Sequence, residues 1–246
     1  LRLWLDFLEQ AKRGISLNIL TIREPTTLYR ADAFKHGIGG FNVFHGRAWR
    51  FAIPPDLQNR ATLNVLEFFA SIVGPWVDLL ERNLPEFSCI WSQTDSTTAD
   101  GWMHKSSFKD ANTAHFTGSR KLAKILIRAK CQLASEWIPG DTNKVADSLS
   151  RDTDLSDADL TTVLHLHVPL QLPPNFEIRA LPVEISSWLT SLLQKLPDPK
   201  QPPNKPVRSQ LRLGSAGPLT CRLLSPKPSR SQRRPNRIDW QSRQLY

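Results

Sequence analysis

Four acidic residues lie where acids are unusual, inside or directly after apolar segments. Asp32 falls in a strand pattern, Glu67 in an amphipathic helix pattern, Asp95 at the end of another strand pattern and Asp147 in a short helix pattern. Taken singly, each has an ordinary explanation as a turn, cap or solvated helix residue. If they converge, their charges repel and raise one another's pKa unless divalent cations neutralise them. Oxygen ligands of this kind suit Mg²⁺, with Mn²⁺ as a substitute.

The spacing of apolar residues predicts the elements that would position these acids. Three strands joined by short turns, over 27–34, 38–44 and 48–53, predict an antiparallel meander. Two further strands and five helices are expected from the remaining apolar patterns, at 87–91 and 133–138 for the strands and at 1–13, 59–73, 117–131, 143–151 and 182–196 for the helices. We expect Gly74-Pro75 to interrupt or kink the second of these helices. The order predicts an α/β fold with a mixed five-stranded sheet flanked by helices.

Glycines follow Asp32 closely, at Gly37, Gly39 and Gly40. They should let the second strand fold back tightly and leave its backbone bare where a nucleic-acid strand could approach.

Composition bounds the class of protein. The chain has 246 residues, 40% hydrophobic and 22% charged, which suits one core with extensions. Residues 196–246 hold 11 Lys and Arg against 2 Asp and Glu, and 9 of the 19 prolines, so this tail is expected to be disordered and to act as a linker or a phosphate-attracting arm.

Three cysteines without a C-x-x-C pair favour neither a disulfide framework nor a zinc site. The most apolar stretch, 65–80, is too short and too charged for us to expect a membrane span.

Four motifs together resemble the ribonuclease H domain of retroelement reverse transcriptases. They are DAFKHGIGG at 32–40, LNVLEF at 63–68, TDS at 94–96 and IPGDTNKVADSLSR at 138–151. The last is typical of retrotransposon polyproteins. The N-terminal segment LRLWLDFLEQAKRGISLN resembles the connection from the polymerase in retrotransposons of the tyrosine-recombinase (DIRS-like) type.

The resemblance implies a ribonuclease H-like fold and a metal site formed by Asp32, Glu67, Asp95 and Asp147. Two Mg²⁺ ions there would support hydrolysis of the RNA strand of an RNA/DNA hybrid. The implied partners are the hybrid and the polymerase domain of the parent polyprotein. An intracellular location, in the cytoplasm or nucleus, and no membrane partner are expected.

Several polar residues are candidates for substrate contacts. Asn64 lies one turn before Glu67 and Ser96 follows Asp95, so both could reach sugar or phosphate groups. Ordinary capping or helix-surface roles explain them equally well. A basic ridge is expected on the helix over 117–131, formed by Arg120, Lys121, Lys124 and Arg128. Taken alone, such a ridge is more often a solvated face than a phosphate site.

One position departs from the family pattern. Many members have a histidine ten residues before the last aspartate, and this chain has Trp137 there. Slower turnover, or a loop that works differently, is the expected consequence.

Four segments are predicted: 1–26 as a helix and connection from a polymerase, 27–152 as the ribonuclease H-like domain, 153–196 as a linker with an amphipathic helix, and 197–246 as the basic Pro-rich tail. Two alternative functions stay open. One is an inactive nucleic-acid-binding or scaffolding module of a degenerate retroelement. The other is an integrase or transposase of the same superfold, although those place the glutamate last rather than second. The four acids favour the nuclease.

Overall fold

The computed structural model describes residues 2–12, 24–105 and 113–197. The main elements follow in the order α1 (Arg2–Lys12), β1 (Thr27–Phe34), β2 (Gly37–Asn42), β3 (Arg47–Ala52), α2 (Leu63–Leu80), β4 (Cys89–Thr94), α3 (Thr97–Lys105), α4 (Thr113–Ala129), β5 (Gln132–Trp137), α5 (Lys144–Arg151), α6 (Asp157–His167), β6 (Glu177–Ile178) and α7 (Val183–Lys195). Short 3-10 helices lie at Pro55–Leu57, Gly140–Thr142 and Pro169–Gln171. The disorder expected for the basic tail falls, from residue 198 on, outside the described residues.

The strands form one mixed sheet in the order β5-β4-β1-β2-β3-β6. β1, β2 and β3 are antiparallel neighbours, as the short turns between them dictate. β4 runs parallel to β1, and β5 runs parallel to β4, because α2 and α4 return the chain to the same end of the sheet. The predicted α/β architecture is therefore confirmed. The sheet has six strands rather than the five predicted, since β6 pairs in parallel with the start of β3.

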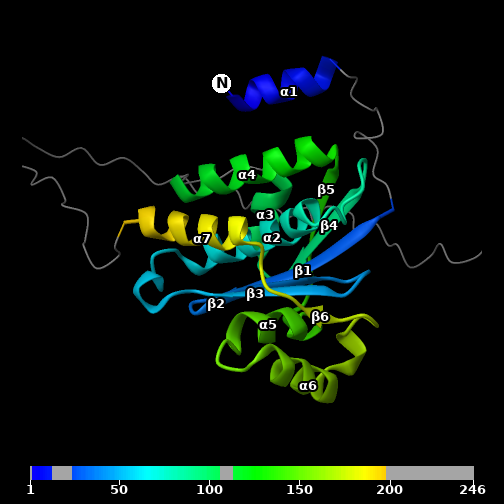
Figure 1. The fold of residues 1–246 in the computed structure, drawn as a ribbon, viewed down its shortest axis with the longest axis vertical. Helices are drawn as coiled ribbons and strands as arrows, with labels where there is room; N and C mark the ends of the chain where they lie inside the picture. Colours follow the sequence, from blue (N-terminus) through cyan, green and yellow to red (C-terminus); the bar gives the residue numbers. More distant parts are fainter. Residues whose placement is uncertain (1, 13–23, 106–112, 198–246) are drawn as a thin grey trace, which may run out of the picture. The chain divides into compact units, whose positions relative to one another are not determined.

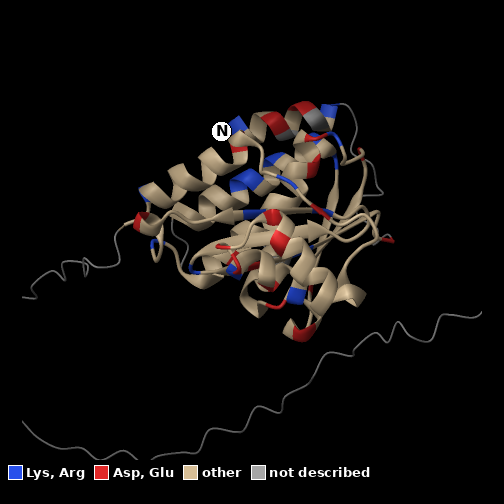
Figure 2. Cartoon of the chain, turned by 60° about the horizontal axis from the view of Figure 1, so that its bottom comes forward, with Lys and Arg blue, Asp and Glu red and all other residues tan. Residues whose placement is uncertain are grey.

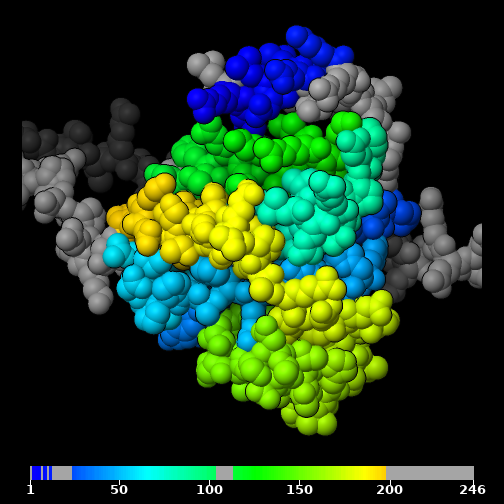
Figure 3. Space-filling view, in the orientation of Figure 1, coloured from blue at the N-terminus to red at the C-terminus, as the bar shows by residue number. Residues whose placement is uncertain are grey.

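Helices cover both faces of the sheet (Figure 1). α2, α3, α4 and α7 lie on one side, and α5 and α6 on the other. The larger core cluster packs α2, α4 and α7 against the strands, and a second cluster joins Phe41 of β2 to Leu149 of α5 and Leu160 of α6. Figure 3 shows α7 in yellow, lying beside α4 in green. The fold is thus a sheet between two helical layers.

α2 is the central helix of the larger cluster. Every residue from Val65 to Asp78 is buried, and the helix continues through Pro75. The expected interruption at Gly74-Pro75 is therefore wrong, because tertiary packing outweighs the local cost of the proline. Gly74 has a packing role, since a Cβ there would lie 2.7 Å from the ring of Tyr29. By length and composition α2 could cross a membrane, but 78% of its apolar window is buried inside the fold, as in a core helix.

The glycines of β2 make room for a helix. A Cβ on Gly39 would lie 2.5 Å from the Cβ of Leu149, and one on Gly37 would lie 2.7 Å from the Ser150 carbonyl oxygen. Both close neighbours belong to α5. At Gly37 and Gly39, the expectation of backbone left bare for nucleic acid is wrong, because α5 covers it. The glycines instead allow α5 to pack directly on the sheet.

Residues 153–196 hold more structure than the predicted linker with one helix. α7 was expected, but α6 and β6 were not. Leu160 and Leu164 of α6 are buried against α5 and the sheet, and Phe176 packs edge-on against Phe41 at a centroid distance of 6.1 Å. This segment is part of the packed fold.

Candidate metal-binding carboxylate site

Asp32 and Asp95 lie at the same end of the sheet because their strands are parallel neighbours. Asp32 is two residues before the end of β1, and Asp95 directly follows β4. The register pairs Arg30 with Gln93, so the two acids lie at the same level of adjacent strands. The carboxyl ends of parallel strands are common places for polar sites.

Asp32 is buried, with 5% of its surface exposed. Its carboxylate accepts a hydrogen bond from the Ser150 hydroxyl at 2.7 Å. Burial raises the pKa of Asp32 to about 7, and the charges of Asp95 and Asp147 add to this effect, although Ser150 and the Ala33 backbone N–H oppose it. A carboxyl group so placed needs a positive charge nearby to ionise at low cost.

Glu67 projects from α2 toward the same acids. It is 9% exposed, and its Oε2 atom is buried without a hydrogen-bond partner among the described residues. Burial raises its pKa and the charge of Asp95 raises it further, while the Ser96 hydroxyl opposes the shift. An orphaned buried carboxylate oxygen costs free energy unless something binds it.

Asp147 reaches the site from α5, which two polar contacts tie to β1. Asn143 donates from Nδ2 to the Ala31 carbonyl at 3.2 Å, and Ser150 bonds to Asp32. The carboxylate of Asp147 is half-exposed and pairs with Arg151. Burial lowers the pKa of Arg151, but the bond to Asp147 and the charges of the other acids outweigh it and raise the pKa overall.

The donor set suits a hard divalent cation. All four predicted acids supply oxygen atoms, and Glu67 Oε2 has no hydrogen-bond partner in the part of the chain that the structure describes. As the side chains lie, however, no three His, Cys, Asp or Glu side chains of the described chain are grouped closely enough to hold a metal ion. Asp147 is paired with Arg151 in this arrangement. A cation held by all four acids would therefore have to replace that pairing.

The two expected sugar or phosphate contacts are placed differently. Asn64 is exposed in the first turn of α2, one turn from Glu67. Ser96 lies between β4 and α3, and its Oγ accepts a hydrogen bond from the Ala99 backbone N–H at 3.2 Å. Ser96 thus acts as a helix cap, which leaves Asn64 as the freer candidate.

The four basic residues of α4 do not form one free ridge. The Lys121 ammonium lies 3.6 Å from the ring centroid of Trp76 and 4.0 Å from Glu184 Oε1. Burial lowers its pKa, Lys124 and Arg128 lower it further, and Glu184 raises it. Lys121 is therefore engaged by α2 and α7, as a cation–π contact would place it.

α1 approaches the other end of this ridge. Lys124 and Arg128 line a hollow together with Asp6 and Glu9 of α1. Figure 2 shows acidic positions of α1 above a helix with basic positions. Arg128 lies in the last turn of α4, and β5 begins three residues after the helix ends. The first residue of β5 pairs with Cys89, the first residue of β4. Arg128 is therefore near the start of β4, at the opposite end of that strand from Asp95. Arg120 is exposed.

Trp137 stands beside the carboxylates. It is the last residue of β5 and pairs with Thr94 of β4. Its indole N–H donates to the Asp95 backbone carbonyl at 2.8 Å, while 47% of the residue stays exposed. Gly140, three residues later, also approaches Asp95: a Cβ on this glycine would lie 3.1 Å from Asp95 Oδ2. The loop after β5 therefore closes against Asp95.

Sequence reasoning missed a second buried aspartate, Asp78, which is 1% exposed. Its Oδ2 accepts from the Tyr29 hydroxyl at 2.6 Å, from Asn42 Nδ2 at 2.9 Å and from His45 Nε2 at 3.1 Å. Burial and the charge of Asp78 raise the pKa of Tyr29. The three partners lie 33 to 49 residues before Asp78 in the chain, so only the fold reveals them.

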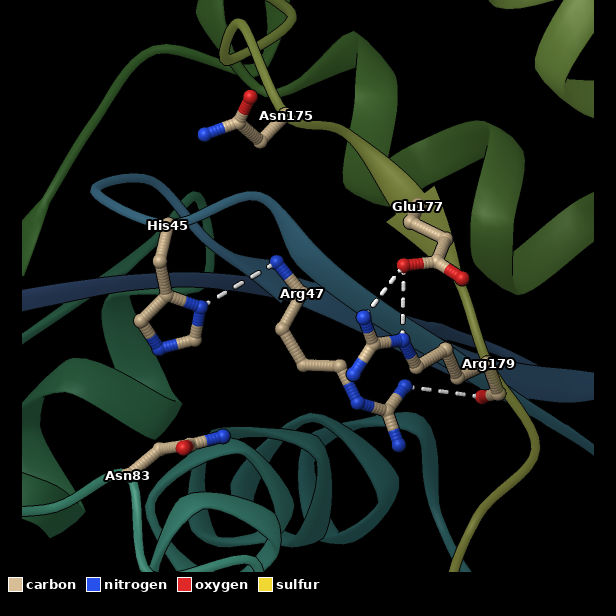
Figure 4. Close-up of a pocket in the computed structure, with 6 residues that line it drawn as sticks. All are labelled: His45, Arg47, Asn83, Asn175, Glu177 and Arg179. Atoms are coloured by element: carbon tan, nitrogen blue, oxygen red, sulfur yellow. Dashed lines mark hydrogen bonds and ion pairs between the residues drawn. The ribbon is translucent and has the colours of Figure 1, made fainter.

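A polar hollow of about 360 Å³ opens beside this network, at the opposite end of β1 from Asp32 (Figure 4). Its lining residues are His45, Arg47, Asn83, Asn175, Glu177 and Arg179. Arg47 donates to Glu81 and to the backbone carbonyls of Ala48, Arg179 and Ala180, and Arg179 pairs with Glu177. These charges satisfy one another, so they hold β3, α2 and β6 together.

Comparisons with known proteins return ribonuclease H structures at low similarity. No family model matches the chain, and no curated protein matches it. RNase H1 from Halobacterium salinarum is 18% identical, with a TM-score of 0.39, over 51% of this chain and 95% of that one. LC11-RNase H1, solved with an RNA/DNA hybrid, is 19% identical, with a TM-score of 0.41, over 53% of this chain and 100% of that one. The N-terminal RNase H domain of a Mycobacterium tuberculosis protein is 20% identical, with a TM-score of 0.39, over 56% and 97%. Similarities of this size assign no activity to the chain.

Proposed function

We propose that this chain is a metal-dependent endonuclease that hydrolyses the RNA strand of RNA/DNA hybrids. We also propose that it is the ribonuclease H part of a retrotransposon reverse transcriptase of the DIRS-like type, with a polymerase domain as its partner in the polyprotein. RNA/DNA hybrids arise inside cells, so a cytoplasmic or nuclear location belongs to the proposal.

One observation carries the proposal. Two buried acids, Asp32 of β1 and Glu67 of α2, lie near Asp95, yet few donors face them. Asp32 has the Ser150 hydroxyl and Glu67 has the Ser96 hydroxyl, but Glu67 Oε2 has no partner among the described residues. The charge of Asp95 raises the pKa of both buried carboxyl groups. Such clustering is unfavourable without a cation, so a cation-binding role explains it best.

Each acid would have a distinct part in holding the metal. Asp32 is fixed on the sheet, and Ser150 orients its carboxylate. Glu67 offers from α2 an oxygen that has no partner among the described residues, while Asp95 and Asp147 are only partly buried and would complete the ligand set. Bound divalent cations would supply an activated water and charge stabilisation for phosphodiester hydrolysis. Asn64, exposed one turn before Glu67, would contact the ribose 2′-hydroxyl in this proposal.

The test is cleavage of a hybrid labelled on its RNA strand. We expect Mg²⁺-dependent cleavage by the full chain, no cleavage in EDTA and none by Asp95→Asn. Asp56→Asn is the matched control, because Asp56 lies in the short 3-10 helix after β3, outside the carboxylate site. Cleavage that survives EDTA or Asp95→Asn would contradict the proposal.

A second candidate function follows from Arg151. Its guanidinium already neutralises Asp147, and the acids of the described chain are not grouped to hold a metal as they lie. A module that binds hybrids without cleaving them would keep this pairing. Calorimetric titration with Mg²⁺ separates the two: heat of binding that Asp32→Asn abolishes supports the nuclease, and no binding supports the inactive module.

A further inference from the structure

Trp137 is an exposed aromatic residue whose ring is nevertheless held in place. Almost half of its surface is open, at 47%, and its only polar atom donates to the Asp95 carbonyl. An exposed tryptophan without a fixed partner samples several rotamers, whereas this hydrogen bond favours one orientation. The flat surface is therefore prepared before any ligand arrives.

The position of this surface is set by β4 and β5. Thr94 pairs with Trp137, and the Ile138 backbone N–H donates to the Thr94 carbonyl at 2.9 Å, so the chain stays in register to the end of the strand. The next residue along β4 is Asp95, one of the four acids. The indole thus lies at the edge of the carboxylate site, because β5 is the neighbour of β4, and Asp95 directly follows β4.

Indole chemistry limits what Trp137 can do there. Its N–H neither gains nor loses a proton in the working range of a protein, so it supplies no acid or base. An aromatic face offers a contact for another flat or apolar surface, and base–aromatic stacking is a common use of such residues in nucleic-acid binding. Trp137 therefore fits a binding role better than a proton-transfer role.

We propose that Trp137 is a platform for the nucleotide next to the phosphate that meets the carboxylates. The shared chemistry is contact with the flat, apolar face of a nucleotide, either its base or its sugar. The inference rests on the proposed hybrid-cleaving function, and it adds a substrate-contact residue beside the acids.

Hybrid affinity in EDTA tests this inference separately from cleavage. We expect Trp137→Ala in the full chain to weaken binding of a fluorescent RNA/DNA hybrid roughly tenfold, while Trp137→Phe keeps most of the affinity because it keeps an aromatic face. Trp137→Leu should behave like the alanine variant, since it restores bulk without a ring. Phe44→Ala is the control, because Phe44 is also exposed, at 51%, but lies beyond β2 at the other end of the sheet.

Hybrids with one abasic ribonucleotide separate the two nucleotide faces. If the base stacks on Trp137, Trp137→Ala causes no further loss on a hybrid that is abasic at the contacted position. If the sugar makes the contact, the tenfold loss persists on every abasic hybrid. Either pattern supports the platform.

The outcomes that overturn it are distinct from a failure of the nuclease assignment. Equal affinities for wild type and Trp137→Ala, or equal losses in Trp137→Ala and Phe44→Ala, would overturn the platform even if cleavage is normal. Binding without cleavage by wild type would overturn the nuclease alone. A wild-type chain that does not bind hybrids would overturn both. Thermal melts of each variant, followed by circular dichroism, distinguish lost contacts from lost folding.

Discussion

Asp32 of β1 and Asp78 of α2 are both buried aspartates, but their surroundings are opposite. Asp78, at the start of the strand, accepts hydrogen bonds from Tyr29, Asn42 and His45. Asp32, near the end of the strand, has one side-chain donor, Ser150, and two further acids close enough to raise its pKa. A buried carboxylate surrounded by donors supports the fold, whereas one surrounded by acids costs stability. The proposed cation at the Asp32 end of the sheet would account for this difference.

Isosteric substitution of the two acids gives the largest expected contrast. Asp32→Asn should lose cleavage about 10³-fold or more, because a metal ligand supports several kcal/mol of charge stabilisation, and about 4 kcal/mol corresponds to that factor. Asp78→Asn should keep cleavage but unfold at a lower temperature, since Tyr29, Asn42 and His45 lose an ionised acceptor. Initial cleavage rates and thermal melts measure both. Normal activity of Asp32→Asn would remove the contrast.

The pH dependence of stability sharpens the same contrast. The pKa of Asp32 is raised to about 7 in the folded chain, so between about pH 4 and pH 7 the folded state holds a proton that the unfolded state has released. The metal-free protein should therefore lose stability as pH rises through this window, by up to ~4 kcal/mol. Asp32→Asn should remove that slope. Urea unfolding in EDTA at a series of pH values measures it, and equal slopes in both proteins would contradict the raised pKa.

Gly39 allows a test of how α5 reaches the Asp32 end. Gly39→Ala would place a Cβ 2.5 Å from Leu149 Cβ and 2.6 Å from the backbone carbon of the same residue, so α5 must shift. We expect a loss of about 1–3 kcal/mol in stability and weaker cleavage. Gly101→Ala is the matched control, because none of the described residues lies within 4 Å of its added Cβ. Since Gly101 is inside α3, alanine should raise the free energy of unfolding by about 0.5–1 kcal/mol. Denaturant midpoints of both variants measure these changes in stability, and an unchanged midpoint for Gly39→Ala would contradict the tight packing of α5 on Gly39.

Arg151 offers the smallest expected effect. Arg151→Ala frees Asp147, so Mg²⁺ should bind more tightly, by about fivefold at most, because a half-exposed ion pair contributes under about 1 kcal/mol. Arg151→Lys keeps the charge and should resemble wild type. Mg²⁺ titration followed by calorimetry measures the affinities. Weaker Mg²⁺ binding in the alanine variant would show that Arg151 supports the site rather than competing with the cation.

The meander, and with it the alignment of Asp32 with Asp95, could be predicted because the signals for these strands are local. Apolar alternation and short turns fix β1, β2 and β3, and parallel pairing then aligns Asp32 with Asp95. The role of Gly39 and the partners of Lys121 could not be predicted in this way. Each depends on a contact between segments distant in sequence, Gly39 with Leu149 and Lys121 with Trp76.

α6 and β6 were missed for a different reason. α6 buries only Leu160 and Leu164, while Val163 and Leu166 are exposed, so its apolar residues do not mark one helical face in the sequence. β6 has two residues and offers no alternation. In the sequence, Asp78 is only one of the charges in the apolar stretch 65–80. Its three hydrogen-bond donors lie 33 to 49 residues away, so the sequence does not indicate them. Short elements and long-range polar networks carry little signal in their own sequence.

β6 also bears on where the chain can be cut. Its backbone pairs with β3 through bonds from Glu177 to the Gly46 carbonyl and from Arg179 to the Ala48 carbonyl, both at 3.0 Å. A fragment ending at residue 152 would keep all four acids but expose this strand edge and the face of Phe41. Unpaired edges of this kind recruit strands from other molecules and promote aggregation. A fragment for expression should therefore extend through β6, and also through α7, whose Ile185 and Leu189 are buried in the larger core cluster.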